Sequence, residues 1–439
     1  MTRPFRSPGT LALAALCVAA AVHLRTSARD LAHAGPGESD AAPPKAQAVD
    51  VDGAIRRGVA YLVSAQNKDG SWGSPASNLW DIYAPMPGSF ITFAVAATAL
   101  STSALLEAGG DDPAAAAAVA RATAWLLENH GKAKRITADT LYNVWANSYA
   151  IEAFCRLLDR EKDPARQKAL RDACAVDVDL LTRFEFVDGG WGYYNFDIVA
   201  QRPEHGATSF TTATVLIALA AAKAHGVAVP ERIVTRGLAL IETCRKPDWA
   251  FEYSWEHRFF PQGRINKTKG SLARTPVCMD AYLAWGKPVP VERRAQALDD
   301  LERYGRFLLI ARKYPIPHEA WYQNSGYFCF YGYYYASLLV KDAPEDRRPE
   351  WRRQLASHLV PIQEKDGSWW DYQLYNYHKA YGTSYVLMAL AYGKRGDAPY
   401  PPKSPRHSQN DWVTRGYANP AVDVRRDYGR VGVRGSGPR

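Results

Sequence analysis

Apolar side chains recur at helical spacing along most of the chain, and the helices that they predict come in pairs. Near the start of the pattern, Ile55, Val59 and Leu62 keep the i, i+3/i+4 spacing of a helix with one buried face. Proline or glycine stands at joints between the segments. The predicted pairs are 51–66 with 90–108, 113–129 with 140–158, 164–184 with 208–225, 230–244 with 275–286, 291–311 with 327–340, and 348–363 with 377–392.

The first and second helices of a pair differ in charge. In the third pair, Arg166, Lys168 and Asp172 give the first helix a polar face, whereas the second begins with an uncharged run over 208–217. A helix with one polar face lies at the surface, and a helix without charged residues lies inside. Six such pairs predict an all-α fold, the (α/α)6 toroid, in which six inner helices are enclosed by six outer ones. An open solenoid of the same hairpins is the alternative, and it would need the polar end caps that a closed ring does not.

A tight turn with a tryptophan joins the outer to the inner helix in several pairs. The sequence Gln-x-x-Asp-Gly-Ser-Trp ends at Trp72 and again at Trp369, and a looser Asp-Gly-Gly-Trp copy ends at Trp191. Successive copies are 119 and 178 residues apart, which corresponds to two and three units of about 60 residues. Trp249 and Trp321 fall near two of the remaining positions. The residues of the motif are Gln66, Gly70, Trp72, Gly189, Trp191, Gln363, Gly367 and Trp369.

The N-terminus has the pattern of an export signal. Arg3 and Arg6 precede an apolar run over 11–22, and a small-x-small cleavage sequence ends at Ala34. The run is short for a membrane span, and an uncleaved N-terminal anchor is the alternative. We predict a signal peptide over 1–34, a linker over 35–50, the toroid over 51–394 and a basic, irregular tail over 395–439. The expected location is the periplasm or the cell exterior.

Composition narrows the classes of function. Much of the net charge of +9 lies in the C-terminal segment, so the toroid is only mildly basic and no nucleic-acid partner is expected. The chain has 25 Tyr, 14 Phe and 13 Trp, and tyrosine and tryptophan suit a cavity wall because each has a large apolar face and one polar group. The cysteines beyond the signal are widely spaced and form no Cys-x-x-Cys pair, which predicts buried thiols. They are Cys155, Cys174, Cys244, Cys278 and Cys329.

With its Gln-to-Trp turns at 66–72 and 363–369, the chain resembles the QW-repeat family of squalene and oxidosqualene cyclases. It also resembles the β subunits of protein prenyltransferases, which share the toroid. The resemblance covers about 51–394 and implies an apolar or isoprenoid-like ligand. It does not imply catalysis, because the motif is structural: its glutamine can bond helix ends, and its indole packs beside them.

The acid motif that cyclises squalene in that family, Asp-x-Asp-Asp, is missing. The third inner helix has Thr-Thr-Ala-Thr at 211–214 instead, and no Asp-Asp-x-x-Asp magnesium motif occurs. The chain is also about one toroid long, where squalene cyclases carry two. Cyclisation of the familiar kind is therefore not expected, and catalysis is left open. The candidates for a catalytic role are Asp280, His378 and Asp197.

The prenyltransferase resemblance implies a zinc set, and its nearest match here is Cys278, Asp280 and His378. Thiolate, carboxylate and imidazole can bind zinc and leave one position open. The family has Asp-x-Cys, however, whereas this chain has Cys-Met-Asp, and side chains two positions apart point to different sides of a helix. We predict no metal and no other cofactor.

Aromatic residues at the joints are candidates for a ligand site. Every inner helix of such a repeat begins at the same rim, so the helix N-termini direct partial positive charge at one cavity mouth. The connection over 246–274 is long enough to form a lid and carries several basic residues. We predict an aromatic cavity for an apolar or amphiphilic small molecule, with peripheral membrane contact as a further expectation. The candidate ligand-binding residues are Trp145, Tyr193, Tyr194, Trp255, Arg258, Tyr322, Trp370, Tyr377, His378 and Tyr381.

Two other functions stay open at this point. A toroid that binds or cleaves polysaccharide would need aromatic platforms, and cleavage by hydrolysis would need two carboxylates about 5–10 Å apart. The acids at the joints include Asp188, Glu252 and Asp371. A non-catalytic protein-interaction toroid would have a filled centre and an exposed apolar patch. The oligomeric state does not follow from the sequence.

Overall fold

The computed structural model describes residues 49–76, 89–135, 140–195 and 203–395, so the predicted signal peptide and basic tail lie outside the described residues. Within these ranges the regular secondary structure is helical, and β-pairing is limited to isolated bridges. The inner helices are α3 (Ser89–Ala108), α5 (Asn143–Leu158), α7 (Ser209–Ala224), α9 (Arg274–Ala284), α12 (Phe328–Leu339) and α14 (His378–Arg395). The outer helices are α2 (Val51–Ser64), α4 (Pro113–Asn129), α6 (Pro164–Arg183), α8 (Glu231–Cys244), α10 (Val291–Tyr304), α11 (Arg306–Ala311) and α13 (Arg348–Leu359).

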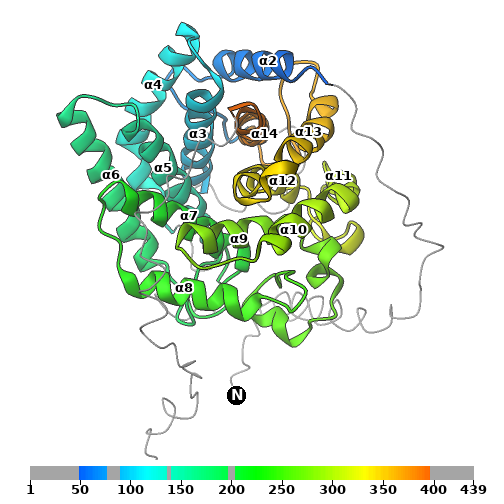
Figure 1. Ribbon diagram of the computed structural model, residues 1–439. Coiled ribbons are helices and arrows are strands. Elements are labelled where there is room, and N and C mark those ends of the chain that lie inside the picture. The colour runs from blue at the N-terminus through cyan, green and yellow to red at the C-terminus, as the bar shows by residue number, and fades with distance from the viewer. Residues whose placement is uncertain (1–48, 77–88, 136–139, 196–202, 396–439) are drawn as a thin grey trace, which may run out of the picture. The chain divides into compact units, whose positions relative to one another are not determined.

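The inner helices form a closed ring. Each packs against the next, and α14 packs against α3, so that the last inner helix meets the first (Figure 1). The predicted (α/α)6 toroid is confirmed, and the open solenoid is wrong. Burial explains why the inner helices carry few charged residues. By length and hydropathy α3 could cross a membrane, but 72% of its apolar stretch is buried among its neighbours.

The tryptophan turns fasten each outer helix to the following inner helix in the same way. The indoles of Trp72, Trp191 and Trp369 are fully buried. Each indole Nε1 donates a hydrogen bond of 2.8 Å to a carbonyl ten residues earlier, near the end of the outer helix. The backbone N–H of each tryptophan donates to a threonine hydroxyl of the inner helix, at 2.9–3.1 Å. One residue thus holds two helices together and satisfies a carbonyl that a helix end would leave unpaired.

The first residue of the turn reaches the next outer helix. Gln363 Nε2 donates to the carbonyl of Ala54 in α2 at 3.0 Å, across the point where the ring closes. Gln66 makes the equivalent bond to Ala118 of α4 at 2.9 Å. In the third turn Glu185 holds this position and pairs with two arginines of α8, at 2.8 and 2.9 Å. Each turn therefore links three helices.

Three details of the repeat differ from the pattern in the sequence. In the fourth turn Phe251, not Trp249, is buried in the position of the tryptophan, and Trp249 takes the position of the glycine with a φ of 65°. Trp321 is 59% exposed in a short 3-10 turn. The fifth outer helix, predicted as one helix over 291–311, is divided at Gly305 into α10 and α11. The apolar spacing continues across that glycine, so the spacing alone did not reveal the break. The five described cysteines are buried and unpaired, as predicted.

Candidate functional site

A cavity of about 460 Å3 occupies the N-terminal half of the inner ring. Its walls come from the N-terminal parts of α3, α5, α7, α12 and α14 and from the loops that lead into α7, α9, α12 and α14. These helices therefore begin at the same rim, as predicted. The volume lies in the range typical of small-molecule sites. The aromatic lining residues are Phe93, Tyr142, Trp145, Tyr149, Tyr193, Tyr194, Phe210, Tyr253, Tyr327, Phe328, Tyr331, Tyr372, Tyr377, Tyr381 and Tyr385.

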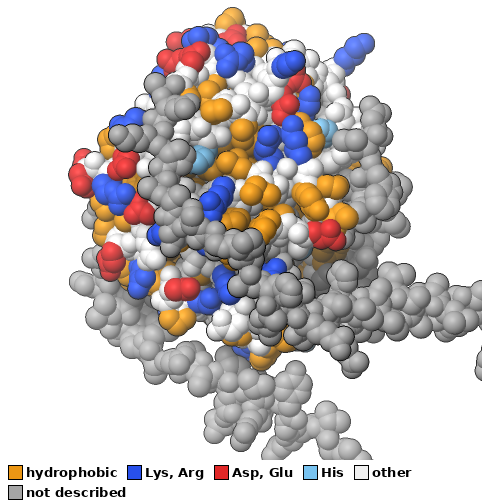
Figure 2. Space-filling model, turned by 90° about the vertical axis from the view of Figure 1, so that its right-hand side faces the viewer, with side chains coloured by type: hydrophobic (Ala, Val, Ile, Leu, Met, Phe, Trp, Pro, Cys, Tyr) orange, Lys and Arg blue, Asp and Glu red, His pale blue; other side chains and the backbone are white. Residues whose placement is uncertain are grey.

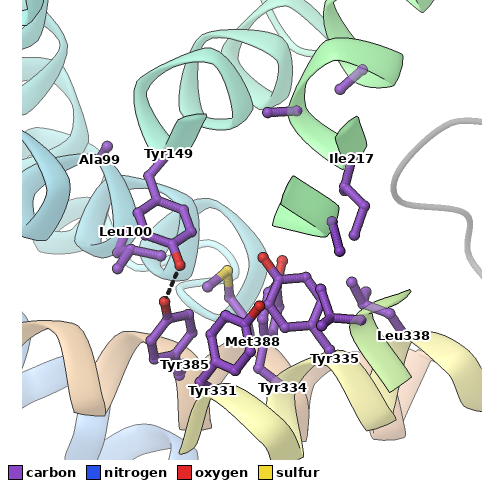
Figure 3. Close-up of a cluster of buried hydrophobic side chains, with 14 of the residues drawn as sticks. Ala99, Leu100, Tyr149, Ile217, Tyr331, Tyr334, Tyr335, Leu338, Tyr385 and Met388 are labelled. Carbon is purple, nitrogen blue, oxygen red and sulfur yellow. Dashed lines mark hydrogen bonds between the residues drawn. The ribbon is translucent and has the colours of Figure 1, made fainter. Parts of the chain in front are cut away.

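The floor of the cavity is a cluster of packed tyrosines. Figure 3 shows Tyr149 of α5 directed at Tyr385 of α14, with a hydrogen bond between their hydroxyls. Tyr331 and Tyr335 of α12 pack beside this pair, their ring centres 4.7 Å apart. Met388 lies among the same side chains and is buried. The cluster fills the ring below the cavity, so the ring is not a through-channel at this level.

The tyrosine hydroxyls of the wall pair with one another. Tyr142 bonds Tyr194, and Tyr193 bonds Tyr253. Burial raises the pKa of Tyr142, Tyr193 and Tyr253 well above the usual value, so these phenols are neutral at pH 7. Because the hydroxyls are used between neighbours, the wall presents ring faces to a ligand. Ring faces favour apolar groups and cations.

One corner of the cavity is polar, and we define the polar corner as Tyr253, Ser254, His257, His318 and Tyr327. His318 Nδ1 lies 2.9 Å from the carbonyl oxygen of Gln323, and His318 Nε2 lies 3.1 Å from the hydroxyl of Tyr327. A carbonyl oxygen can only accept, so Nδ1 carries the proton and the Tyr327 hydroxyl donates to Nε2. On the other loop, His257 Nδ1 lies 2.8 Å from Ser254 Oγ.

A buried arginine lies behind the polar corner. Arg274 is 1% exposed and donates to the carbonyls of Phe251 and Ile265, and no carboxylate of the described residues forms an ion pair with it. Its guanidinium carbon is 5.5 Å from the centre of the Tyr253 ring. Burial lowers the pKa of Arg274 to about 10, a value at which the side chain stays charged at pH 7. The polar corner therefore lies beside a buried positive charge that forms no ion pair with a described carboxylate.

That charge and the burial of the corner keep both histidines neutral. Burial lowers the pKa of His257 to about 4, and the charge of Arg274 acts in the same direction. Burial likewise lowers the pKa of His318, again with a contribution from Arg274. Neutral imidazoles at pH 7 can accept a proton, which a protonated histidine cannot.

Half of the predicted ligand-binding residues line the cavity. They are Trp145, Tyr193, Tyr194, Tyr377 and Tyr381. Trp145 lies between α7 and α12, with its ring 6.0 Å from that of Phe210 and 6.1 Å from that of Tyr331. Tyr381 donates to the buried carboxylate of Asp371 at 2.8 Å, which fixes its ring against the wall.

The other predicted ligand-binding residues lie outside the lining. The guanidinium of Arg258 stacks 3.6 Å from the ring of Trp255. Tyr322 packs against Phe307, with ring centres 4.8 Å apart. The last two, Trp370 and His378, pack against each other, with ring centres 5.2 Å apart. None of these five side chains contributes to the lining of the cavity, and each packs against an aromatic ring.

Neither of the two catalytic candidates that the structure describes, Asp280 and His378, lines the cavity. Asp280 is buried in α9 and contributes nothing to the lining, and its burial raises the pKa of its carboxyl well above the usual value. His378 Nδ1 bonds the carbonyl of Tyr375. Asp197 lies outside the described residues. Cys278, Asp280 and His378 form no cluster, and no group of three or more potential metal ligands occurs in the part of the chain that the structure describes.

Sequence reasoning missed most of the lining, including the polar corner. Residues such as Tyr149, Tyr331 and Tyr385 lie within the inner helices. The low charge of these segments predicted that they are buried, but it did not indicate which side chains face a cavity. A usable signal was present: Tyr327 with Tyr331, and Tyr381 with Tyr385, are spaced i, i+4, which places both rings of each pair on one helix face. His257 and His318 stand in irregular loops and gave no such signal.

The predicted cationic mouth does not form from the described residues. No Lys or Arg is among the lining residues, which include one carboxylate, Glu256. In the long fourth connection, Lys246 bonds the carbonyl of Asn266 at 3.0 Å, and Lys269 lies over the rings of the fifth unit. On the side that bears α11 and α13, Figure 2 shows Lys and Arg interspersed with Asp and Glu. These basic residues therefore serve the packing of loops rather than a continuous positive surface.

Comparison with solved structures supports the fold. A cellobiose 2-epimerase from Spirochaeta thermophila aligns over 79% of this chain and 97% of its own, with 13% identity and a TM-score of 0.51. The fold is that of an (α/α)6 toroid. A type II terpene cyclase from Scytonema (15% identity, 78% and 97% covered, TM-score 0.46) and an alpha-1,6-mannanase from Salegentibacter (10%, 79% and 100%, 0.47) also align with the toroid. No protein-family description and no characterised protein matches the chain by sequence. The predicted resemblance therefore holds at the level of the fold.

Proposed function

We propose that the toroid binds an apolar, isoprenoid-like small molecule in its central cavity. The observation that carries this proposal is the wall itself: fifteen aromatic residues surround about 460 Å3, and the lining holds one carboxylate and no basic side chain of the lysine or arginine type. Burying apolar surface against such rings contributes about 25 cal/mol per Å2. A ligand with an extended apolar body gains most from this wall.

The alternative functions find less support in the same lining. Hydrolysis of a polysaccharide needs two facing carboxylates, and the described lining contributes only Glu256. A protein-interaction toroid with a filled centre does not match a ring that is hollow in its N-terminal half. The terpene cyclase of the comparison and the sugar-active enzymes have the same fold, so the fold alone does not choose among these functions.

Filling the cavity tests the proposal. Ala96 lies in α3 and lines the cavity, so Ala96→Trp places an indole in the space that a ligand would occupy. We expect the full-length protein to bind farnesol, and Ala96→Trp to weaken this binding by at least about tenfold, or about 1.4 kcal/mol. Binding is measured by native mass spectrometry and by calorimetry. The matched control is Ala117→Trp on the exposed face of α4, which adds the same indole away from the cavity.

Two outcomes would count against the proposal. Farnesol binding that is equal in the wild type and in Ala96→Trp would place the ligand elsewhere. Binding of cellotetraose in place of farnesol would favour the hypothesis of a polysaccharide-binding toroid.

Export is a separate proposal that rests on Arg3, Arg6 and the apolar run over 11–22. It predicts that cell fractionation finds the toroid outside the cytoplasm, and that deletion of 1–34 retains it inside.

A further inference from the structure

The loop that connects α11 to α12 holds an unusual concentration of backbone strain. Lys313, His318, Tyr322 and Gln323 have φ between 55° and 66°, a region that side chains other than glycine rarely adopt. Among the described non-glycine residues, only Trp249 and Tyr375 share this conformation. Such strain persists where the surrounding structure imposes it, and it is concentrated at functional sites. His318, one of the strained residues, lines the cavity.

The strain places His318 against Tyr327. Gln323, itself strained, supplies the carbonyl that holds His318 Nδ1–H at 2.9 Å. The lone pair of Nε2 is thereby directed at the Tyr327 hydroxyl, 3.1 Å away. Ser325 Oγ accepts from the His318 backbone N–H at 3.0 Å and also lies 3.2 Å from Nδ1 of the same ring. The imidazole has one orientation and one tautomer, as a proton acceptor requires.

Burial keeps Tyr327 in its neutral form, although several neighbouring groups favour negative charge on its oxygen. Burial raises its pKa, but hydrogen bonds with Ser325, Tyr193 and Tyr253 act in the opposite direction. The charge of Arg274, which no described carboxylate balances, also favours the anion. Fixed donors and a buried positive charge stabilise a developing oxyanion most strongly where water is excluded.

We propose that Tyr327 and His318 form a proton-transfer pair that acts on an apolar substrate with an enolisable carbonyl group. The inference rests on the proposed function, because the aromatic wall must first hold the apolar body of that substrate. Tyr327 is the residue that touches the substrate. His318 acts through Tyr327.

The step balances without any co-reactant. The C–H bond next to the carbonyl breaks, its proton passes to Tyr327 Oη, and the proton of Tyr327 passes to His318 Nε2. The electron pair of the C–H bond forms the C=C bond of the enolate, and the negative charge resides on the carbonyl oxygen. Return of the proton to the same carbon regenerates the substrate, and return to a conjugated carbon gives its isomer.

Hydrogen exchange in D2O tests the pair on the full-length protein. The probe is 2-tetralone, an apolar two-ring ketone whose hydrogens next to the carbonyl are acidic. We expect the protein to accelerate loss of these proton signals in NMR spectra by about 100-fold or more over buffer. Tyr327→Phe and His318→Gln should reduce exchange to the buffer rate. Saturation-transfer NMR on the same samples should show that both variants still bind the ketone.

The control and the contrary outcomes separate this inference from the proposed function. Tyr333→Phe removes a buried hydroxyl of α12 that lies outside the cavity lining and has no hydrogen-bond partner, so it should leave exchange unchanged. Binding of 2-tetralone without exchange would overturn the proton-transfer pair and leave the proposed function standing. Failure to bind either 2-tetralone or farnesol would overturn both. Exchange that survives in both variants would assign the proton transfer to other residues.

Discussion

The tryptophan turns and the cavity loops occupy the same position in the repeat, between an outer and an inner helix, but they follow different rules. The turns that end at Trp72, Trp191 and Trp369 repeat the same hydrogen bonds to within a few tenths of an ångström. The loops before α9 and α12 contain 3-10 turns, left-handed side-chain-bearing residues and both histidines of the polar corner. The regular turns hold the ring together, and the irregular loops supply the polar groups of the cavity.

The fourth turn shows how a regular tryptophan turn can become an irregular cavity loop. Phe251 replaces the buried tryptophan, and a phenyl ring cannot donate the bond that an indole Nε1 gives to the outer helix. Trp249 replaces the glycine, is half-buried against the core and lies 4.8 Å from the guanidinium of Arg245. The segment that follows leaves the standard path and brings Tyr253, Ser254 and His257 to the cavity. Loss of the standard turn thus coincides with the gain of polar groups at the site.

Truncating a tryptophan of a regular turn and one of the irregular fourth turn should produce the largest difference in the free energy of unfolding. Trp191→Ala removes a fully buried indole and its bond to Leu181, and should lower the free energy of unfolding by about 3–5 kcal/mol. Trp249→Ala removes a half-buried ring with one cation–π contact, and should cost about 1 kcal/mol. Urea denaturation followed by circular dichroism measures both. Equal losses would mean that Trp249 does fasten the fourth hairpin.

A buried carboxyl group in the sixth connection should cause a smaller change in the free energy of unfolding, and this change depends on pH. Asp371 is fully buried and accepts from the Phe330 N–H at 2.9 Å, and burial raises the pKa of its carboxyl from 3.8 to about 6. Between about pH 4 and pH 6 the folded chain retains a proton that the unfolded chain has lost. The contribution of Asp371 to the free energy of unfolding therefore falls as pH rises through this window, by up to about 3 kcal/mol.

The matched variant is Asp371→Asn, which keeps the shape and one acceptor but does not titrate. Denaturation at pH 4 and at pH 7 should show the wild type losing stability relative to the variant as the pH rises. A difference between the two proteins that stays constant from pH 4 to pH 7 would contradict the prediction.

Substitutions at the glycine position of the turn should give the smallest change in the free energy of unfolding. They compare Gly70 of a regular turn with Trp249 of the irregular fourth turn. Gly70 has a φ of 96°, and a Cβ there would lie 2.6 Å from the carbonyl oxygen of Arg121. Gly70→Ala should therefore cost about 1–3 kcal/mol. Trp249→Gly relieves a left-handed side chain but loses its packing, so the two effects should nearly cancel, to within about 1 kcal/mol. Thermal unfolding of both variants measures the difference, and a tolerated Gly70→Ala would show that this position is less constrained than its geometry indicates.

The sequence predicted the ring well and the site only in part, for physical reasons. Helical spacing, the low charge of the inner helices and the tryptophan period are repeated six or three times, and repetition makes a pattern detectable despite local exceptions. Five lining residues were predicted because they are aromatic and near a joint. Arg274 and His318 were missed, because their roles depend on loops that fold by side-chain-to-carbonyl bonds without a period. The break at Gly305 was missed because the apolar spacing continues through it.

The two ends of the toroid meet at a seam, where α14 and the sixth turn contact α2. This seam has a consequence for how the chain could be cut and rejoined. Lys394 of α14 pairs with Asp52 of α2 at 2.8 Å, and Gln363 bonds Ala54 as Gln66 bonds Ala118. The seam is thus built like the joints between neighbouring repeats, although no peptide bond crosses it. Proteins with adjacent ends tolerate circular permutation. A chain that begins at 113 and ends at 109, with 394 joined to 51 by a short linker, should form the same ring, since the order of its helices around the centre does not depend on where the covalent chain starts.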